Sequence, residues 1–188
     1  MMMNKASKSI FLAVLLMATA LLYAGGWELL SDWESAFVDW TVVNTLTTVA
    51  NPQIDADNPS AACGRYVTTT NQWDLIYVDL SEPADFTLHP LYRLKVLAPT
   101  AGSILYKFEN AGNTQSVTRE LYPTPGKWDE LLFDFADAPS GVFVRMVIFI
   151  DFLGTTANKY WYVDDLYRNT TAGVDSLPPG APTSLRVT

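Results

Sequence analysis

The sequence predicts an all-β fold, a two-sheet antiparallel β-sandwich, for residues 27–169. Short runs rich in Val, Ile, Thr and aromatic residues recur along this stretch, and their apolar and polar positions alternate as in half-buried strands. Segments rich in Pro, Gly, Asn and Asp separate the runs. No segment after residue 27 keeps an apolar 3.6-residue period long enough for a helix. Roughly nine or ten strands in about 140 residues is the pattern expected of such a sandwich.

In the first half of this stretch, the expected strands lie on either side of two loops. Residues 37–43 (FVDWTVV) and 65–70 (RYVTTT) are rich in β-branched and aromatic residues and flank the Pro- and Asp-rich segment 51–64. Residues 73–80 (WDLIYVDL) and 91–98 (LYRLKVLA) alternate apolar and polar positions on the two sides of the turn sequence SEPAD. Each run is therefore interpreted as a strand with one buried face.

The second half continues the same pattern. Short turn sequences such as NAGN, YPTPG and GTTAN separate its runs. The runs cover residues 103–109, 115–121, 127–135, 142–152 and 159–168. The last of them, KYWYVDDLYR, sets Asp164 beside Asp165 in a strand otherwise built for burial. Such a pair is either a solvated edge or part of a site that holds a ligand.

Residues 1–26 differ from the rest and are predicted to be a secretory signal peptide. Lys5 and Lys8 precede an apolar run from Ile10 to Ala24, and small residues follow it. The run is shorter than the roughly 20 residues that a membrane-spanning helix needs. We therefore expect a secreted, cell-surface or periplasmic protein with no membrane insertion after cleavage. A membrane anchor is the alternative.

The charge of the chain limits the classes of ligand that it can bind, and its cysteine content limits its disulfides. Removal of Lys5 and Lys8 with the signal peptide lowers Lys+Arg from 12 to 10 against 20 acidic residues, so the formal charge falls from −8 to −10. Such a surface repels nucleic acid and anionic membranes, and it favours a neutral polysaccharide over a polyanion. Cys63 is the single cysteine, so it forms no internal disulfide and is interpreted as a small buried hydrophobe.

Residues 170–188 lose aromatic residues and gain Pro, Gly, Ser and Thr, which is typical of a linker. Their last part, PGAPTSLRVT, resembles the opening strand of a fibronectin type III domain. A single first strand does not fold alone. The chain is therefore expected to be a fragment of a longer protein, with further domains covalently linked downstream. A disordered terminus is the alternative.

Motifs in the later strands carry a family resemblance. The most telling are KWDELLFDF, RMVIFIDF and YVDDL, within a likeness that spans about residues 29–168. In these motifs the chain resembles the jelly-roll, galactose-binding-like carbohydrate-binding modules appended to secreted bacterial polysaccharide hydrolases. The resemblance implies a β-jelly roll over residues 27–169 that binds glycans without cleaving them and holds a structural calcium ion.

The resemblance also implies calcium ligands. Glu34 matches the family's early acidic residue, and Asp164 matches an aspartate two residues before the apolar residue of the last strand, here Leu166. The first and last strands of a jelly roll can lie together, and Ca²⁺ prefers oxygen ligands. Neighbouring strand residues face opposite ways, so Asp165 shares the site only if a bulge intervenes. Asp32 is a weaker candidate, and a set of surface acids without metal is the alternative.

Alternation along the strands selects candidates for glycan binding. Sugars stack their C–H faces on aromatic rings and need hydrogen-bonding partners for their hydroxyls. The candidates are two aromatic platforms and four polar residues: Trp73, Tyr77, Lys107, Glu109, Arg145 and Asp151. Their strand faces are expected to line one concave sheet surface. Packing in the core is the alternative for each aromatic residue, and it is favoured for Trp128 and Trp161.

Catalysis is not expected. Glu130 and Asp134 lie on one strand about 13 Å apart, beyond the roughly 5 to 9.5 Å that glycosidase carboxylates need. His89 is interpreted as an exposed loop residue, and no serine lies in a nucleophile-elbow sequence. The sequence favours a non-catalytic glycan-binding module of a larger polysaccharide-degrading or surface protein. A ligand-free structural or adhesion spacer is the alternative, and a hydrolase domain is a third. An exposed aromatic strip on one sheet face would favour the binder over the spacer.

Overall fold

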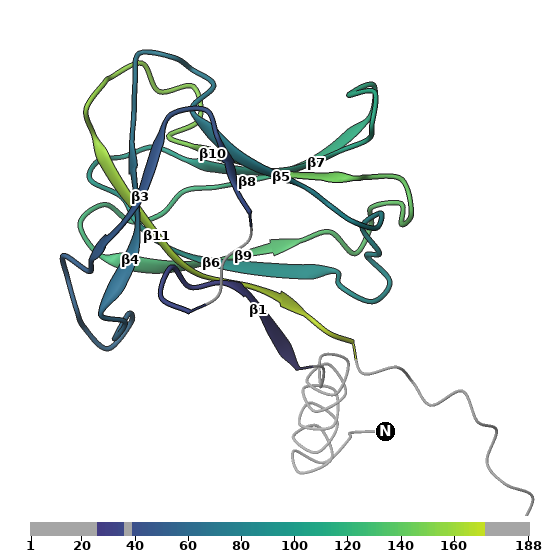
Figure 1. Cartoon of the computed structure of the whole chain (residues 1–188), viewed down its shortest axis with the longest axis horizontal. Coiled ribbons are helices and arrows are strands. Elements are labelled where there is room, and N and C mark those ends of the chain that lie inside the picture. Colours follow the sequence, from purple (N-terminus) through teal and green to yellow (C-terminus); the bar gives the residue numbers. More distant parts are fainter. Residues whose placement is uncertain (1–25, 36–38, 172–188) are drawn as a thin grey trace, which may run out of the picture. The chain divides into compact units, whose positions relative to one another are not determined.

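The structure is a computed structural model that describes residues 26–35 and 39–171. Within these ranges the chain forms strands joined by turns and loops, and no helix that could cross a membrane occurs there. The strands make two antiparallel sheets that lie as separate layers (Figure 1), which confirms the predicted all-β sandwich. The predicted signal peptide and fibronectin-like tail lie outside the described residues, apart from Gly26, Thr170 and Thr171.

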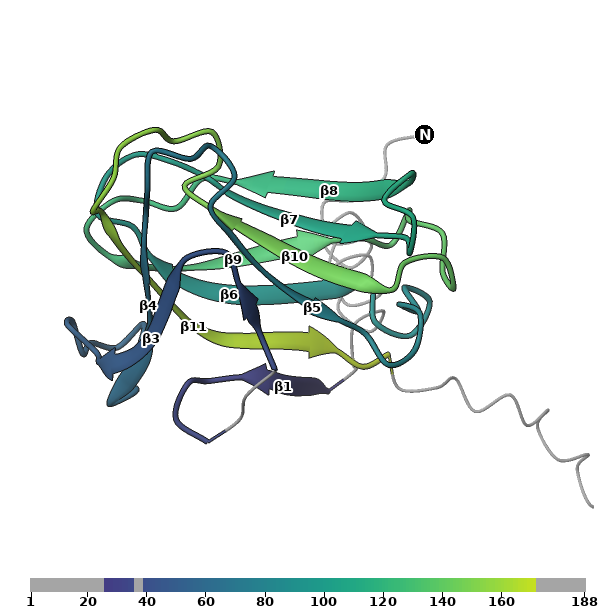
Figure 2. The same ribbon diagram turned by 45° about the horizontal axis from the view of Figure 1, so that its top comes forward.

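The larger layer, which we call the β11 sheet, has six strands in the order β3-β4-β11-β6-β9, with β1 paired to the C-terminal half of β11. Its strands are β1 (Trp27–Ser31), β3 (Thr45–Ala50), β4 (Ala62–Val67), β6 (Leu91–Leu97), β9 (Trp128–Asp134) and β11 (Tyr160–Asn169). The first and last strands therefore lie side by side, as expected for a jelly roll (Figure 2). No prediction covered β1 or β3.

The smaller layer, which we call the β10 sheet, has five strands in the order β2-β5-β10-β7-β8. Its strands are β2 (Thr41–Val42), β5 (Leu75–Asp79), β7 (Ile104–Glu109), β8 (Ser116–Leu121) and β10 (Arg145–Ile150). All of these fall inside predicted runs, because their sequences alternate clearly and end at Gly, Asn or Pro.

The core between the layers is rich in aromatic rings. Tyr106 packs on Tyr92 and Phe133 of the opposite sheet, with ring centroids 5.4 and 5.1 Å apart. Phe108 meets Phe135 edge-on at 5.0 Å. Burial of each large apolar side chain stabilises the fold by about 1.5–3 kcal/mol. These rings hold the two sheets face to face.

A second apolar cluster lies on the outer side of the β11 sheet. It contains Cys63, Leu97 and Trp128, which are buried. The loop of residues 51–61 reaches over it, since the Trp128 indole Nε1 donates to the Gln53 carbonyl at 2.9 Å. Trp128 and Cys63 are thus buried, as the sequence predicts, and Trp161 is buried in the main core.

A bulge interrupts β11 at the adjacent aspartates. The pairing of β11 with β6 changes register between Asp164 and Tyr167, and Asp165 has a left-handed φ of 49°. Such a bulge re-aims side chains, and Asp tolerates this backbone conformation better than most residues. The Asp165 carboxylate lies 2.8 Å from the ammonium group of Lys95. The pair in KYWYVDDLYR therefore marks a bulge rather than a plain strand.

Close packing at Gly64 makes a stability prediction. A Cβ added to Gly64 in β4 would lie 2.6 Å from the Trp33 indole nitrogen, inside van der Waals contact. We expect Gly64→Ala to lower the free energy of unfolding by about 1–3 kcal/mol in urea denaturation. Gly112→Ala is the matched control, since its Cβ would meet nothing closer than 3.6 Å. Equal stability of the two variants would contradict the placement of Trp33.

Candidate functional site

The core residues of the β10 sheet determine which side chains lie on its outer face. In β5, β10 and β7 the residues that point into the core include Ile76, Met146, Ile148, Tyr106 and Phe108. Successive strand residues point to opposite faces. The residues between them therefore lie together on the side away from the β11 sheet.

Cross-strand register arranges this outer face in three rows. The first row contains Leu75, Phe149, Leu105 and Glu120. The second row contains Tyr77, Val147, Lys107 and Thr118. The third row contains Asp79, Arg145, Glu109 and Ser116. Polarity thus rises from an apolar row to a charged row across one continuous surface.

An exposed indole stands at the apolar end of the face. Trp73, which precedes β5, is 52% exposed. Its ring meets Phe149 and Phe152 edge-on, with centroids 5.9 and 5.8 Å away. Its backbone N–H donates to the Asn71 side-chain oxygen at 3.0 Å, which shapes the turn before the strand. The ring is therefore supported on two sides and still open to solvent.

The charged end of the face is internally paired. The Arg145 guanidinium donates to the Asp79 carboxylate at 2.7 Å and lies 4.5 Å above the centre of the Tyr77 ring. The hydrogen bond from Arg145 lowers the pKa of the Asp79 carboxyl. The Lys107 ammonium lies 2.5 Å from the Glu109 carboxylate, which is itself 7% exposed. The pairs cancel most of the local charge but keep hydrogen-bonding groups at the surface.

The structure brings five of the six predicted glycan-binding residues to this face. They are Trp73, Tyr77, Lys107, Glu109 and Arg145. Asp151 lies apart, because β10 ends at Ile150 and the alternation ends with it. Its carboxylate is buried and 3.0 Å from the Lys159 ammonium, and its φ is 54°. Sequence reasoning missed Asp79, although it stands two residues after Tyr77 in the same alternating run.

The predicted calcium ligands are divided between two environments. Asp164 is 0% exposed and accepts a hydrogen bond from the Asn58 amide at 2.9 Å. Burial raises the pKa of its carboxyl to about 6. No ion pair within residues 26–35 and 39–171 includes Asp164. Asp165 instead faces Lys95.

Glu34 lies in the same neighbourhood as Asp164. Its carboxylate accepts a hydrogen bond from the Ala62 backbone N–H at 2.7 Å. Burial, together with the charges of Asp164 and Glu34, raises the pKa of the Cys63 thiol to about 12. Asp32 accepts hydrogen bonds from its own turn, including the Ser35 N–H at 2.7 Å. In the described part of the chain, no group of three or more His, Cys, Asp or Glu side chains is spaced to hold a metal ion.

The residues considered for catalysis do not converge. Glu130 of β9 lies 3.6 Å from the Arg93 guanidinium, and the Asp134 carboxylate accepts the Ala136 N–H at 2.8 Å. His89 is half-buried rather than exposed, since its Nδ1 lies 2.7 Å from the Asn169 carbonyl oxygen. Each group thus has a structural partner of its own.

No family model and no curated protein matches the sequence. Among solved structures, a family 29 carbohydrate-binding module aligns with a TM-score of 0.53 at 8% identity, over 78% of this chain and 89% of that chain. The family 11 module of the cellulosomal cellulase Lic26A-Cel5E of Clostridium thermocellum aligns with a TM-score of 0.53 at 10% identity, over 78% and 96%.

The CBM22-1 xylan-binding domain of Paenibacillus barcinonensis Xyn10C aligns with a TM-score of 0.52 at 13% identity, over 79% of this chain and 97% of that chain. At such identities the likeness establishes the fold. The chain therefore has the two-sheet antiparallel sandwich of carbohydrate-binding modules, and the predicted resemblance is confirmed at the level of architecture.

Proposed function

We propose that residues 27–169 form a non-catalytic glycan-binding module whose ligand lies on the outer face of the β10 sheet. The observation that carries the proposal is Trp73, which is 52% exposed and supported by Phe149 and Phe152. Tyr77 and Arg145 follow on the same face. An open ring accepts the C–H face of a sugar, and the neighbouring charged groups bond its hydroxyls. The exposed Trp73 ring, with the half-buried Tyr77 on the same face, favours a binder over a spacer.

The ligand that suits this face is a neutral polysaccharide. Arg145 is paired with Asp79, and Lys107 is paired with Glu109, so a polyanion finds no free cation among the charged groups of the second and third rows. Solved modules with the same fold support a polysaccharide ligand. One is named as a xylan-binding domain, and a family 29 variant is complexed with cellulohexaose.

The proposal includes a role within a larger protein. The predicted signal peptide and the family resemblance support a secreted polysaccharide-degrading or surface protein. Binding by one module holds linked domains near the polymer and so raises their local concentration. Glu109 is almost fully covered, so its part is to orient Lys107 rather than to contact the glycan.

Removal of the exposed ring tests the face. We expect Trp73→Ala and Tyr77→Ala each to weaken binding at least about tenfold in depletion assays on insoluble cellulose, xylan, mannan and β-1,3-glucan, because stacking area is lost. Tyr160→Ala is the matched control, since Tyr160 is 49% exposed but belongs to the β11 sheet. Absence of binding by the unmodified chain would support the spacer, and an equal loss in the control would place the site elsewhere.

Salt dependence tests the neutral character of the ligand. Because the charges of the second and third rows are paired with one another, affinity for the polysaccharide retained in the depletion assay should change less than about twofold between 50 and 500 mM NaCl. Isothermal titration with a soluble oligomer of that polymer measures this. A polyanion would instead lose affinity steeply as salt rises, as in any association that releases counterions. A steep loss would contradict a neutral ligand.

We also propose that Asp164 and Glu34 bind a structural calcium ion. The support is the fully buried Asp164 carboxylate, which accepts hydrogen bonds from the Asn58 amide and the Asp165 backbone N–H, both neutral donors. A second carboxylate, that of Glu34, lies near it beside Cys63. A cation at this point offsets the cost of the buried charge. The side chain of Asp165 is bonded to Lys95, so this proposal does not include it. Backbone carbonyls and water would complete the six to eight oxygens that Ca²⁺ prefers.

Thermal melts test the calcium proposal. Saturating calcium is expected to raise the melting temperature over that in EDTA. At a calcium concentration of 100 times the Kd, binding adds about 2.7 kcal/mol to the free energy of unfolding. Asp164→Asn should abolish this response, because a charged ligand is lost, while the control Asp165→Asn should keep it. An unmodified chain that melts at the same temperature with and without calcium would overturn the proposal.

A further inference from the structure

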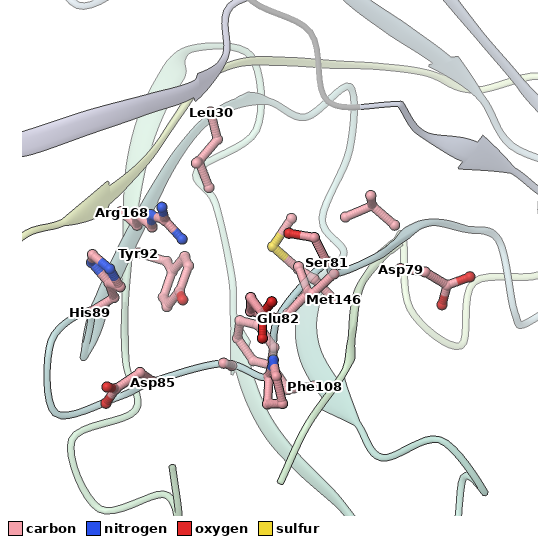
Figure 3. A pocket seen from close by; sticks show the side chains of 14 residues that line it. Leu30, Asp79, Ser81, Glu82, Asp85, His89, Tyr92, Phe108, Met146 and Arg168 are labelled. Atoms are coloured by element: carbon pink, nitrogen blue, oxygen red, sulfur yellow. The ribbon is translucent and has the colours of Figure 1, made fainter. Parts of the chain in front are cut away.

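A pocket of about 460 Å³ lies between the sheets beside the β5–β6 loop. Figure 3 shows its lining, which comes from both layers. Its apolar part includes Leu30 of β1, Val78 of β5, Phe108 of β7 and Met146 of β10. The volume is that of a small-molecule site, and such sites combine an apolar wall with a few polar groups.

Tyr92 places a polar group without a protein partner in this pocket. The residue is 4% exposed, and Figure 3 shows its hydroxyl directed into the space that the lining residues surround. No hydrogen bond to this hydroxyl occurs among the described residues, whereas the neighbouring Tyr106 hydroxyl donates to the Met146 sulfur at 2.6 Å. The hydroxyl is not among the buried side-chain atoms that lack a partner, so it faces the open space of the pocket. An occupant of the pocket can therefore bond it.

The charges around the pocket select against anions. Asp79, Glu82 and Asp85 lie along one part of the lining. The cation opposite them is Arg168, whose guanidinium is bonded to the Glu28 carboxylate at 2.7 Å. An uncharged occupant with hydroxyl groups meets no such repulsion, and carboxylates and hydroxyls are the groups that bond its O–H donors.

We propose that this pocket binds one uncharged sugar ring, through hydrogen bonds to the Tyr92 hydroxyl and the Glu82 carboxylate and through apolar contact with Met146. Asp79 lines the pocket and also belongs to the third row of the outer face. The ring is therefore the terminal unit of a glycan whose preceding units lie on that face. The assignment of the ring as the terminal unit of a longer glycan rests on the proposed function, whereas the binding of a single sugar in the pocket does not.

Amide chemical shifts of the purified chain test the pocket. We expect millimolar glucose, mannose, xylose or galactose to shift the amides of residues 80–85 and of Tyr92, and to leave those of Trp73 and Tyr77 unchanged. Tyr92→Phe, which keeps the ring, should weaken this binding about tenfold, or about 1.4 kcal/mol. Tyr160→Phe is the matched control. Glu82→Gln, at an exposed position, provides a second variant that leaves the core intact.

Each outcome separates the pocket from the outer face. No shift at residues 80–85 with any of these sugars, or unchanged affinity in Tyr92→Phe, overturns the pocket; the effect of Trp73→Ala on polymer binding then still decides the proposed function. Shifts at the pocket without any effect of Trp73→Ala support the pocket and contradict the face. Glucuronate should bind at least about tenfold more weakly than glucose, since the carboxylates around the pocket repel it; equal binding would overturn the assignment to uncharged sugars.

Discussion

The aromatic layer between the two sheets is the constraint on which the proposed binding surface depends. Because Tyr106 and Phe108 of β7 point into the core, Lys107 and Glu109 must point out. The same parity places Arg145 on the outside of β10. A slip of one residue in strand register would bury a charged pair and expose two rings, which no surface contact offsets. The packing of the core therefore fixes which side chains the outer face presents.

The β11 sheet departs from this regular alternation at one point, and a different kind of site results. The bulge at Asp165 leaves Asp164 under the loop of residues 51–61, where Asn58 bonds it, and turns Asp165 to Lys95. Asp165 is thus half-buried and paired with a cation, whereas Asp164 is fully buried and has no cationic partner among the described residues. This short sequence thus contains both a β-bulge and a buried negative charge. The two are connected, because the bulge determines which of the two carboxylates is buried.

The two proposed sugar sites, the outer face and the pocket beside the β5–β6 loop, differ in the contacts that they would make with a sugar. The face has a solvent-exposed indole at Trp73 and paired charges, which suits a long chain that lies flat and is held by many weak contacts. The pocket has an enclosed apolar wall and the unpaired hydroxyl of Tyr92, which suits one ring held on several sides. Asp79 belongs to both, since it lines the pocket and lies in the third row of the outer face. A module with both elements would distinguish the end of a chain from its interior.

The sequence by itself determined the sandwich class, most of the strands and the strand face of most side chains, since these follow from a period of two within one strand. Alternation alone thus selected Trp73, Tyr77, Lys107 and Arg145, which the structure places on one sheet face. Only the tertiary structure decided that β5, β10 and β7 are neighbours, that β10 ends before Asp151, and that Tyr92 meets an open pocket. The order of strands in a sheet and the packing of loops over it depend on contacts between residues far apart in the chain. The local alternation of residues therefore does not predict them.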